Sequence, residues 1–360
     1  MSLQMGLRLM RRNYISVLDQ LTSQTTSTSS RRKTTCLVKS QPVITKHSSM
    51  TYQTYEGTKQ QPYPLTRSET VAFLEDRLGI EHPLECYKED PENLLNRIAE
   101  CIKKKVPFTT GHLFARPLNE TSDIIGKYHI LSGHGGSCGT INPFTSALLQ
   151  NIGYKTKALN GFDPIQGYVV HVTTVVCDVT FPGSRHLVEP GARPPLLRAI
   201  PLDFVAESPV YKCHHMYNKF FKQDGRLLWC ARVPQKALAS LSKHHQVMTD
   251  ANGDDWQVWI IYLLEEPNAR VVFNQYWQQL SRGEKRMSKG VDIFVFTGFQ
   301  KDKFVVVAGS PEKLTFSSFD EDGGAEKYEM TERELKSYFE KTFSENLLDK
   351  IIKANYKYCV

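Results

Sequence analysis

The sequence pattern of the chain changes abruptly near residue 168. Before that point, residues 66–105 carry apolar side chains at spacings of three and four, which predicts two amphipathic helices. The second of these ends ahead of Pro107. After it, residues 168–209 consist of short β-branched runs separated by glycine and proline, of which 169–177 is the longest. We therefore expect a helical unit followed by a β-sheet or small barrel.

The last third of the chain combines both patterns and is predicted to be α/β. It contains a strand at 256–264, a helix at 269–280, a hairpin formed by 292–299 and 303–308, and one or two helices at 331–353. These patterns predict an α+β multidomain fold with a leader (1–50), a helical segment (51–155), a β segment (156–250) and an α/β segment (251–360).

The net charge of +7 is concentrated at the N-terminus. Residues 1–50 hold eight lysines and arginines against one acid, Asp19, which leaves 37 basic and 37 acidic residues in the rest of the chain. A formally neutral remainder does not favour general binding to nucleic acid. No stretch approaches the roughly 18 to 20 apolar residues of a membrane span. We therefore expect neither nucleic acid nor a membrane as a partner.

The leader is basic, poor in acids and rich in serine and threonine, so it cannot bury enough apolar surface to order itself. It fits a mitochondrial transit peptide, a plain disordered tail, or an extension ahead of a start at Met50. The chain starts without a secretory signal pattern, and its eight cysteines form no close pairs. We therefore expect a reduced, cytoplasmic protein, with a mitochondrial location as the alternative.

A cysteine behind two glycines is the strongest functional signal in the chain. Cys138 follows Gly-Gly-Ser at 135–137 and precedes a run, 140–152, whose apolar residues recur at helical spacing. A thiol is a good nucleophile only as a thiolate, which the positive end of a helix and a nearby imidazolium both favour. We therefore predict a nucleophilic Cys138 close to a helix N-terminus.

A cysteine nucleophile needs a base, and the base needs an acid that orients it. Among the eleven histidines, His171 is the best candidate because it lies inside an apolar predicted strand. Glu189 follows eighteen residues later, in the next strand-like segment. Two adjacent antiparallel strands could bring these side chains together. On this pattern alone, a structural histidine is the simpler interpretation.

The order of these motifs resembles that of the arylamine N-acetyltransferases. Val106-Pro107-Phe108 and Gly135-Gly136-Ser137-Cys138 stand where that family has Ile-Pro-Phe-Glu-Asn and Arg-Gly-Gly-x-Cys, ahead of His171. Leu187-Val188-Glu189-Pro190-Gly191 stands where the family has Asp-Val-Gly-Phe-Gly. The similarity runs from about residue 69 to 202 and, more faintly, from 255 to 309.

The resemblance implies a helical bundle (51–155), a β-barrel (156–250) and an α/β lid (251–360) around a papain-like Cys-His-acid core. It makes Cys138 the acetyl-accepting nucleophile, His171 its base and Glu189 the residue that orients the base. It also implies two residues at the substrate and three glycines at the coenzyme, namely Phe108 and Val170, and Gly161, Gly167 and Gly191.

The implied activity is a ping-pong transfer of acetyl from acetyl-CoA, through an acetyl-cysteine, to an arylamine, an arylhydrazine or a similar small amine. Such an enzyme would be a monomer of xenobiotic metabolism that uses acetyl-CoA as co-substrate and needs no metal. The coenzyme phosphates could be held by local basic residues, of which the candidates are Arg193, Arg198, Lys285, Arg286 and Lys289.

The chain also departs from the family pattern. Glu189 replaces the aspartate of the triad, and a small backbone shift can absorb its extra methylene. Other changes surround the nucleophile. His134 stands where the family has an arginine, Ser137 where it has an aromatic residue, and Thr140 where it has Glu or Gln. Thr109-Thr110 replaces the Glu-Asn pair. The triad is intact, but acceptor preference cannot be inherited from the family.

Three other interpretations stay open. A papain-like or transglutaminase-like hydrolase uses the same order of Cys, His and acid but needs a peptide groove. A divergent, non-catalytic protein would have an inert and buried Cys138. A zinc site would use a set of residues whose spacing matches no standard zinc motif, namely Cys213, His214, His215, Cys230, His244 and His245.

Overall fold

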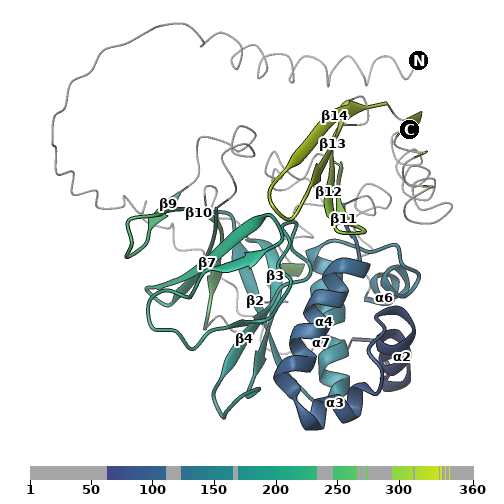
Figure 1. Cartoon of the computed structure of the whole chain (residues 1–360). Coiled ribbons are helices and arrows are strands. Elements are labelled where there is room, and N and C mark those ends of the chain that lie inside the picture. The colour runs from purple at the N-terminus through teal and green to yellow at the C-terminus, as the bar shows by residue number, and fades with distance from the viewer. Residues whose placement is uncertain are drawn as a thin grey trace, which may run out of the picture. The chain divides into compact units, whose positions relative to one another are not determined.

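The computed structural model describes residues 63–110, 123–164, 169–232, 246–265, 294–310 and 313–331, with residues 269, 273, 274, 333, 334, 337 and 340 (Figure 1). The leader and most of the two predicted helices at 269–280 and 331–353 lie outside these residues. The described residues form a group of helices and two antiparallel sheets.

The helices come first along the described chain. They are α2 (Arg67–Ala72), the π-helical turn η1 (Phe73–Arg77), α3 (Pro83–Glu89), α4 (Pro91–Lys105), α6 (Asp123–Leu131) and α7 (Cys138–Ile152). The predicted helices correspond to α2 with η1, α4 and α7, whereas α3 and α6 were not predicted. None of the described helices is long and apolar enough to cross a membrane.

Capping residues explain where the first helices begin. Thr66 forms a capping box with Glu69 at the start of α2, so each residue satisfies a free amide of the other. Asp90 accepts a hydrogen bond from the Asn93 amide at the start of α4, where Pro91 occupies the first position.

The helices and one face of the larger sheet share a hydrophobic core. The inner face of α4 buries Leu95 and Ile98 completely, and α7 buries Phe144 in the same way. Val176 and Val188, from two strands of the sheet, belong to the same cluster. Each such side chain contributes about 1.5–3 kcal/mol by its burial. This core fixes α7 against the sheet.

The larger sheet is curled (Figure 1). Its strands are β2 (Lys155–Phe162), β3 (Val169–Cys177), β4 (Arg185–Val188), β5 (Ile200–Pro201), β6 (Tyr211–Cys213), β7 (Met216–Gln223), β8 (Arg226–Arg232), β9 (Val247–Thr249) and β10 (Asp255–Leu263). The hydrogen-bonded order is β5-β4-β3-β2-β10-β8-β7-β6, and β9 also pairs with β10.

A connecting segment joins the two sides of this sheet. The Leu202 amide donates to the Arg185 carbonyl oxygen at β4 (2.7 Å), and the Ser208 amide donates to the Phe220 carbonyl oxygen on β7 (2.8 Å). The sheet is therefore a curled half-barrel. The prediction of a sheet or small barrel after residue 168 is confirmed in this form.

Strand β10 belongs to this larger sheet. The predicted strand at 256–264 is confirmed, and β10 pairs with both β2 and β8. The boundary drawn at residue 250 assigned this strand to the C-terminal α/β segment instead. The difference arises because a local pattern identifies a strand but does not identify its partners.

The smaller sheet, here called the C-terminal sheet, has the order β1-β11-β12-β13-β14. Its strands are β1 (Phe108–Thr109), β11 (Phe294–Gln300), β12 (Lys303–Ser310), β13 (Lys313–Phe319) and β14 (Ala325–Met330). The predicted hairpin is confirmed as β11 and β12, whereas β13 and β14 were not predicted. Because β1 follows α4 almost directly, it connects the helices to this sheet.

Candidate active site

Cys138 is the first residue of α7, as predicted, and a tight turn holds it there. Gly135 has a φ of +70°, and a Cβ at this position would lie 2.0 Å from the Pro107 carbonyl oxygen. Gly136 donates its amide to that oxygen (3.2 Å) and accepts from the Thr109 amide (2.9 Å). The turn therefore fixes the start of α7 to β1, and it leaves Cys138 only 7% exposed.

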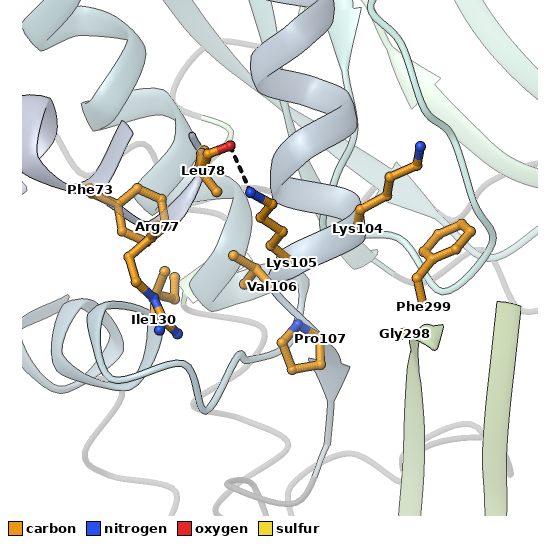
Figure 2. Close-up of a pocket in the computed structure, with 10 residues that line it drawn as sticks. All are labelled: Phe73, Arg77, Leu78, Lys104, Lys105, Val106, Pro107, Ile130, Gly298 and Phe299. Atoms are coloured by element: carbon orange, nitrogen blue, oxygen red, sulfur yellow. Dashed lines mark hydrogen bonds between the residues drawn. The ribbon is translucent and has the colours of Figure 1, made fainter. Parts of the chain in front are cut away.

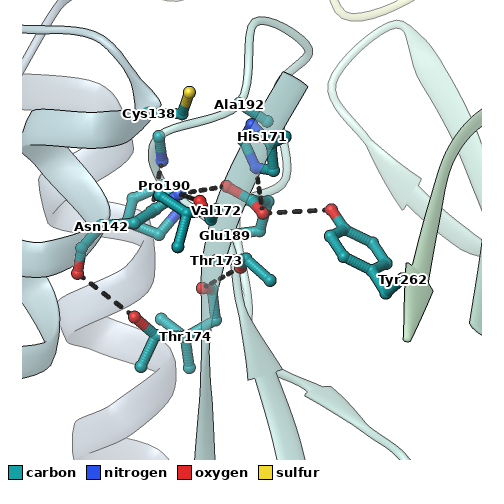
Figure 3. A network of polar contacts seen from close by, with 12 residues as sticks. Cys138, Asn142, His171, Val172, Thr173, Thr174, Glu189, Pro190, Ala192 and Tyr262 are labelled. Atoms are coloured by element: carbon teal, nitrogen blue, oxygen red, sulfur yellow. Dashed lines mark hydrogen bonds and ion pairs between the residues drawn. The ribbon is translucent and has the colours of Figure 1, made fainter. Parts of the chain in front are cut away.

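His171 and Glu189 are brought together by neighbouring antiparallel strands (Figure 3). Because Thr174 of β3 pairs with Val188 of β4, Glu189 lies just beyond the end of β4 and close to His171. His171 Nε2 is 2.7 Å from Glu189 Oε2, and both side chains are buried. This contact leaves Nδ1 of the imidazole free to interact with Cys138.

Cys138 completes what we call the candidate triad, Cys138, His171 and Glu189. Cys138 Sγ lies 3.9 Å from the carbonyl oxygen of Val170, the residue before His171. Burial by itself lowers the pKa of His171, but the charge of Glu189 and the interactions with Cys138 outweigh it and raise this pKa to about 10. The imidazole is therefore charged at neutral pH, which is the form that stabilises a neighbouring thiolate.

Two residues outside the predicted triad hold Glu189. Asn142 Nδ2 donates to Oε1 (2.8 Å), and the Tyr262 hydroxyl donates to Oε2 (3.1 Å). Burial by itself raises the pKa of Glu189, but the charge of His171 and the hydrogen bonds to the carboxylate lower it overall. Asn142 follows Cys138 by four residues, and this spacing was the available sequence signal. Nothing in the sequence around Tyr262 pointed to its contact.

Close packing explains two of the three glycines that were assigned to the coenzyme. Gly161 on β2 pairs with His171 on β3, and a Cβ on Gly161 would lie 2.9 Å from His171 Cβ. A Cβ on Gly191 would lie 2.7 Å from Asn142 Nδ2. Both glycines therefore allow close contact around the candidate triad. Gly167 lies outside the described residues.

Phe108 and Arg193 lie together near Cys138. Phe108 is buried, and the Arg193 guanidinium carbon is 5.9 Å from the centre of its ring. Burial lowers the pKa of Arg193, while the charge of Cys138 opposes that shift. Val170 is half-buried and presents its carbonyl oxygen to Cys138. Among the other basic candidates for the coenzyme phosphates, Arg198 is exposed. The remaining three, Lys285, Arg286 and Lys289, lie outside the described residues.

Two of the residues considered for zinc, His214 and His215, make structural contacts. His214 Nε2 lies 2.7 Å from the Asp302 carbonyl oxygen, and the His215 ring stacks on Phe319 with 4.3 Å between ring centres. Within the described ranges, no three His, Cys, Asp or Glu residues are grouped so that they could hold a metal ion. Of the other four candidates, Cys213 and Cys230 are buried, and His244 and His245 lie outside those ranges.

A separate cavity of about 310 Å³ lies between the helices and β11 (Figure 2). Phe73 and Pro107 contribute to its apolar lining, and Arg77 lies at the same cavity. Lys105 donates from Nζ to the Leu78 carbonyl oxygen (2.8 Å). Since no member of the candidate triad lines it, this cavity is distinct from the candidate active site.

Comparison with known proteins identifies the fold. No model of a known protein family matches the chain, and no curated protein matches it. The chain is similar to the arylamine N-acetyltransferase structure from Mycobacterium abscessus, with a TM-score of 0.59 and 11% identity over 79% of this chain and 94% of that chain. It is similar to the arylamine N-acetyltransferase structure from Nocardia farcinica with a TM-score of 0.60 and 16% identity, over 82% of this chain and 96% of that chain. It is also similar to the Mycobacterium marinum arylamine N-acetyltransferase in complex with CoA, with a TM-score of 0.59 and 16% identity over 81% of this chain and 100% of that chain. The described part of this chain therefore has the fold of the arylamine N-acetyltransferases.

Proposed function

We propose that this protein is an acetyl-CoA-dependent N-acetyltransferase that carries acetyl on Cys138. The observation that carries the proposal is the buried contact between His171 and Glu189 (2.7 Å), next to a cysteine at a helix N-terminus, within this fold. A structural histidine would not require a buried carboxylate on one side and a thiol on the other. The CoA complex of a structural neighbour supports acetyl-CoA as the donor.

In the first half-reaction, the Cys138 thiolate attacks the thioester carbon of acetyl-CoA. The tetrahedral intermediate collapses, the bond to the coenzyme sulfur breaks, and the departing thiolate takes the proton from His171. Glu189 accepts the Nε2–H of His171 and so keeps Nδ1 directed at the sulfur atoms. Because one thioester replaces another, this step is close to neutral in energy.

In the second half-reaction, the amine nitrogen attacks the carbonyl carbon of acetyl-Cys138. His171, now neutral, accepts the proton that the nitrogen releases, and the thiolate leaves to restore the ion pair. An oxyanion forms in both halves and needs hydrogen-bond donors. The first amides of a helix lack partners within that helix, so the Cys138 amide is the donor that we propose.

We propose a small arylamine or arylhydrazine as the acceptor, bound against Phe108. Phe108 places an aromatic ring near the nucleophile, and the Arg193 guanidinium lies over that ring. The Thr297 hydroxyl of the C-terminal sheet donates to the Arg193 carbonyl oxygen (3.3 Å). This contact supports the proposal that the C-terminal sheet acts as a lid on the acceptor side.

A two-substrate kinetic experiment tests this function. The full chain is incubated with acetyl-CoA and a panel of arylamines and arylhydrazines, and both the acetylated amine and free CoA are measured. We expect equal amounts of the two products, parallel lines in double-reciprocal plots, and no turnover with Cys138→Ala. If no amine is acetylated but a peptide electrophile labels Cys138, the proposal is wrong and the result favours a cysteine hydrolase.

A further inference from the structure

A buried lysine that takes no part in the proposed chemistry lies next to the loop that carries Glu189. Lys103 belongs to the last turn of α4 and is only 3% exposed. Burial lowers its pKa to about 7, and the charge of Glu189 opposes this shift. Burying an ammonium costs several kcal/mol unless it is well paired, and an apolar side chain in this position would avoid that cost. The contacts of Lys103 must therefore compensate for its burial.

Among the described residues, the hydrogen bonds of Lys103 go to the residues that follow Glu189. Lys103 Nζ donates to the carbonyl oxygen of Pro190 (3.4 Å) and to the carbonyl oxygen of Ala192. Between these two, the amide of Gly191 donates to Asn142 Oδ1 (3.0 Å). The loop is thus held through its carbonyls by α4 and through its amide by α7.

Glu189 also acts on the Lys103 ammonium, because its negative charge opposes the effect of burial on the pKa of Lys103. No carboxylate forms a hydrogen bond to Nζ among the contacts of the described residues, so the interaction with Glu189 operates through space. In a buried environment such an interaction is stronger than in water. Lys103 is therefore suited both to fix the loop and to favour the ionised form of the carboxyl group.

We propose that Lys103 is a positioning residue that keeps Glu189 in place and ionised against His171. This inference rests on the proposed function of the triad. A glutamate has one more rotatable bond than the aspartate expected here, so its carboxylate needs a more firmly held backbone to reach the imidazole. Lys103 acts only through Glu189 and does not take part in the transfer of acetyl.

The proposal predicts a shift in a pH profile. Without the Lys103 charge, Glu189 is protonated at a higher pH. A protonated Glu189 no longer stabilises the imidazolium of His171, which in turn no longer stabilises the thiolate of Cys138. The acid limb of the profile, which is the pH range over which the rate of Cys138 alkylation falls as the pH is lowered, therefore moves to higher pH. A lysine with only a structural role would change the melting temperature without moving this limb.

The experiment compares iodoacetamide alkylation of Cys138 between pH 4.5 and 8 in the full chain, by mass spectrometry of the peptide that contains it. In Lys103→Met and Lys103→Gln we expect the acid limb to move up by about one pH unit, which is about tenfold in rate on that limb. Lys103→Arg should keep most of the wild-type rate. The matched control is Lys105→Met, because Lys105 also lies in the last turn of α4 and donates to a backbone carbonyl (Leu78, 2.8 Å), but has no hydrogen bond to this loop among the described residues.

A second measurement does not depend on the folding of Lys103 variants. Coupling between two charges is reciprocal, so Glu189→Gln should lower the titration midpoint of the Lys103 ammonium, followed by ¹⁵N NMR of the side-chain nitrogen. An unmoved midpoint, or an unmoved acid limb in folded Lys103→Met or Lys103→Gln, would overturn the inference. If wild-type Cys138 is not alkylated quickly at pH 6, the proposed function fails instead, and the NMR measurement still decides the role of Lys103.

Discussion

Replacing Glu189 with glutamine tests how the acid orients His171. If the new amide nitrogen faces His171, the imidazole must accept at Nε2 and carry its proton on Nδ1, where it can no longer receive the thiol proton of Cys138. If the amide oxygen faces His171 instead, the amide nitrogen meets the donor Nδ2 of Asn142, which is 2.8 Å from that position. Each orientation loses a contact that the carboxylate satisfies.

The size of the effect follows from the burial of the pair. His171 and Glu189 side chains are 7% and 0% exposed, and breaking such a buried pair costs about 3–5 kcal/mol, or roughly 10²- to 10⁴-fold in rate. Thiolate formation has a lower ceiling, since a free thiol with a pKa of about 8.5 is already ~0.3% ionised at pH 6. We therefore expect Glu189→Gln to slow alkylation at pH 6 by about 30- to 300-fold, and acetyl transfer by more.

The assay is the rate of iodoacetamide alkylation of Cys138 at pH 6, with thermal unfolding as the test of folding. Glu265→Gln is the matched control, because that side chain is 77% exposed and pairs with Arg185 at the surface (2.9 Å). Its rate should equal that of the wild type. A folded Glu189→Gln protein that reacts within about threefold of the wild type would refute the role of the carboxylate, since a threefold change is only ~0.7 kcal/mol.

Three further predictions concern the pH dependence, the hydroxyl donor and the turn. In the folded protein the pKa of His171 is raised from 6.5 to about 10. The charged imidazole therefore contributes its full stability below pH 6.5, and this contribution is lost as the pH rises toward 10. The difference in melting temperature between wild type and His171→Ala should shrink over that range. Tyr262→Phe removes a donor to Glu189 and should slow acetyl transfer by about 3- to 10-fold, which is ~0.5–1.5 kcal/mol. Gly135→Ala adds a clash of the Cβ with Pro107 to the strain of a positive φ, and should lower the free energy of unfolding by about 2–6 kcal/mol, measured by urea denaturation.

Each of these predictions has a control or a contradicting result. A constant difference in melting temperature from pH 6 to 10 would contradict the raised pKa of His171. Wild-type turnover in Tyr262→Phe would show that the Tyr262 hydroxyl is not needed to hold the carboxylate. Gly183 also has a positive φ (+89°), but a Cβ added there would meet nothing within 4 Å, so Gly183→Ala should destabilise less than Gly135→Ala.

The features that the sequence revealed are local ones. The start of α7 at Cys138 follows from the glycine turn and the helical spacing after it, and the hairpin of β11 and β12 follows from two adjacent β-branched runs. The meeting of His171 and Glu189 needed one further assumption, that consecutive strands pair. That assumption is sound because consecutive strands usually lie next to each other.

The features that the sequence did not reveal depend on contacts between distant segments. Tyr262 reaches Glu189 only because β10 joins the larger sheet, a pairing that no local pattern encodes. Lys103 lies in a run of three lysines, which looks like a solvated helix end, yet its side chain turns inward to the loop at 190–192. The packing of Gly161 against His171 is likewise visible only once the strand register is known.

The central claim, that Cys138 carries the acetyl group, is tested most directly by mass spectrometry of the intact full chain after mixing with acetyl-CoA. We predict a single adduct of about 42 Da on Cys138, absent from Cys138→Ala and removed when an arylamine is added. A wild-type chain that gains no acetyl group, although its Cys138 is alkylated quickly at pH 6, would contradict the claim.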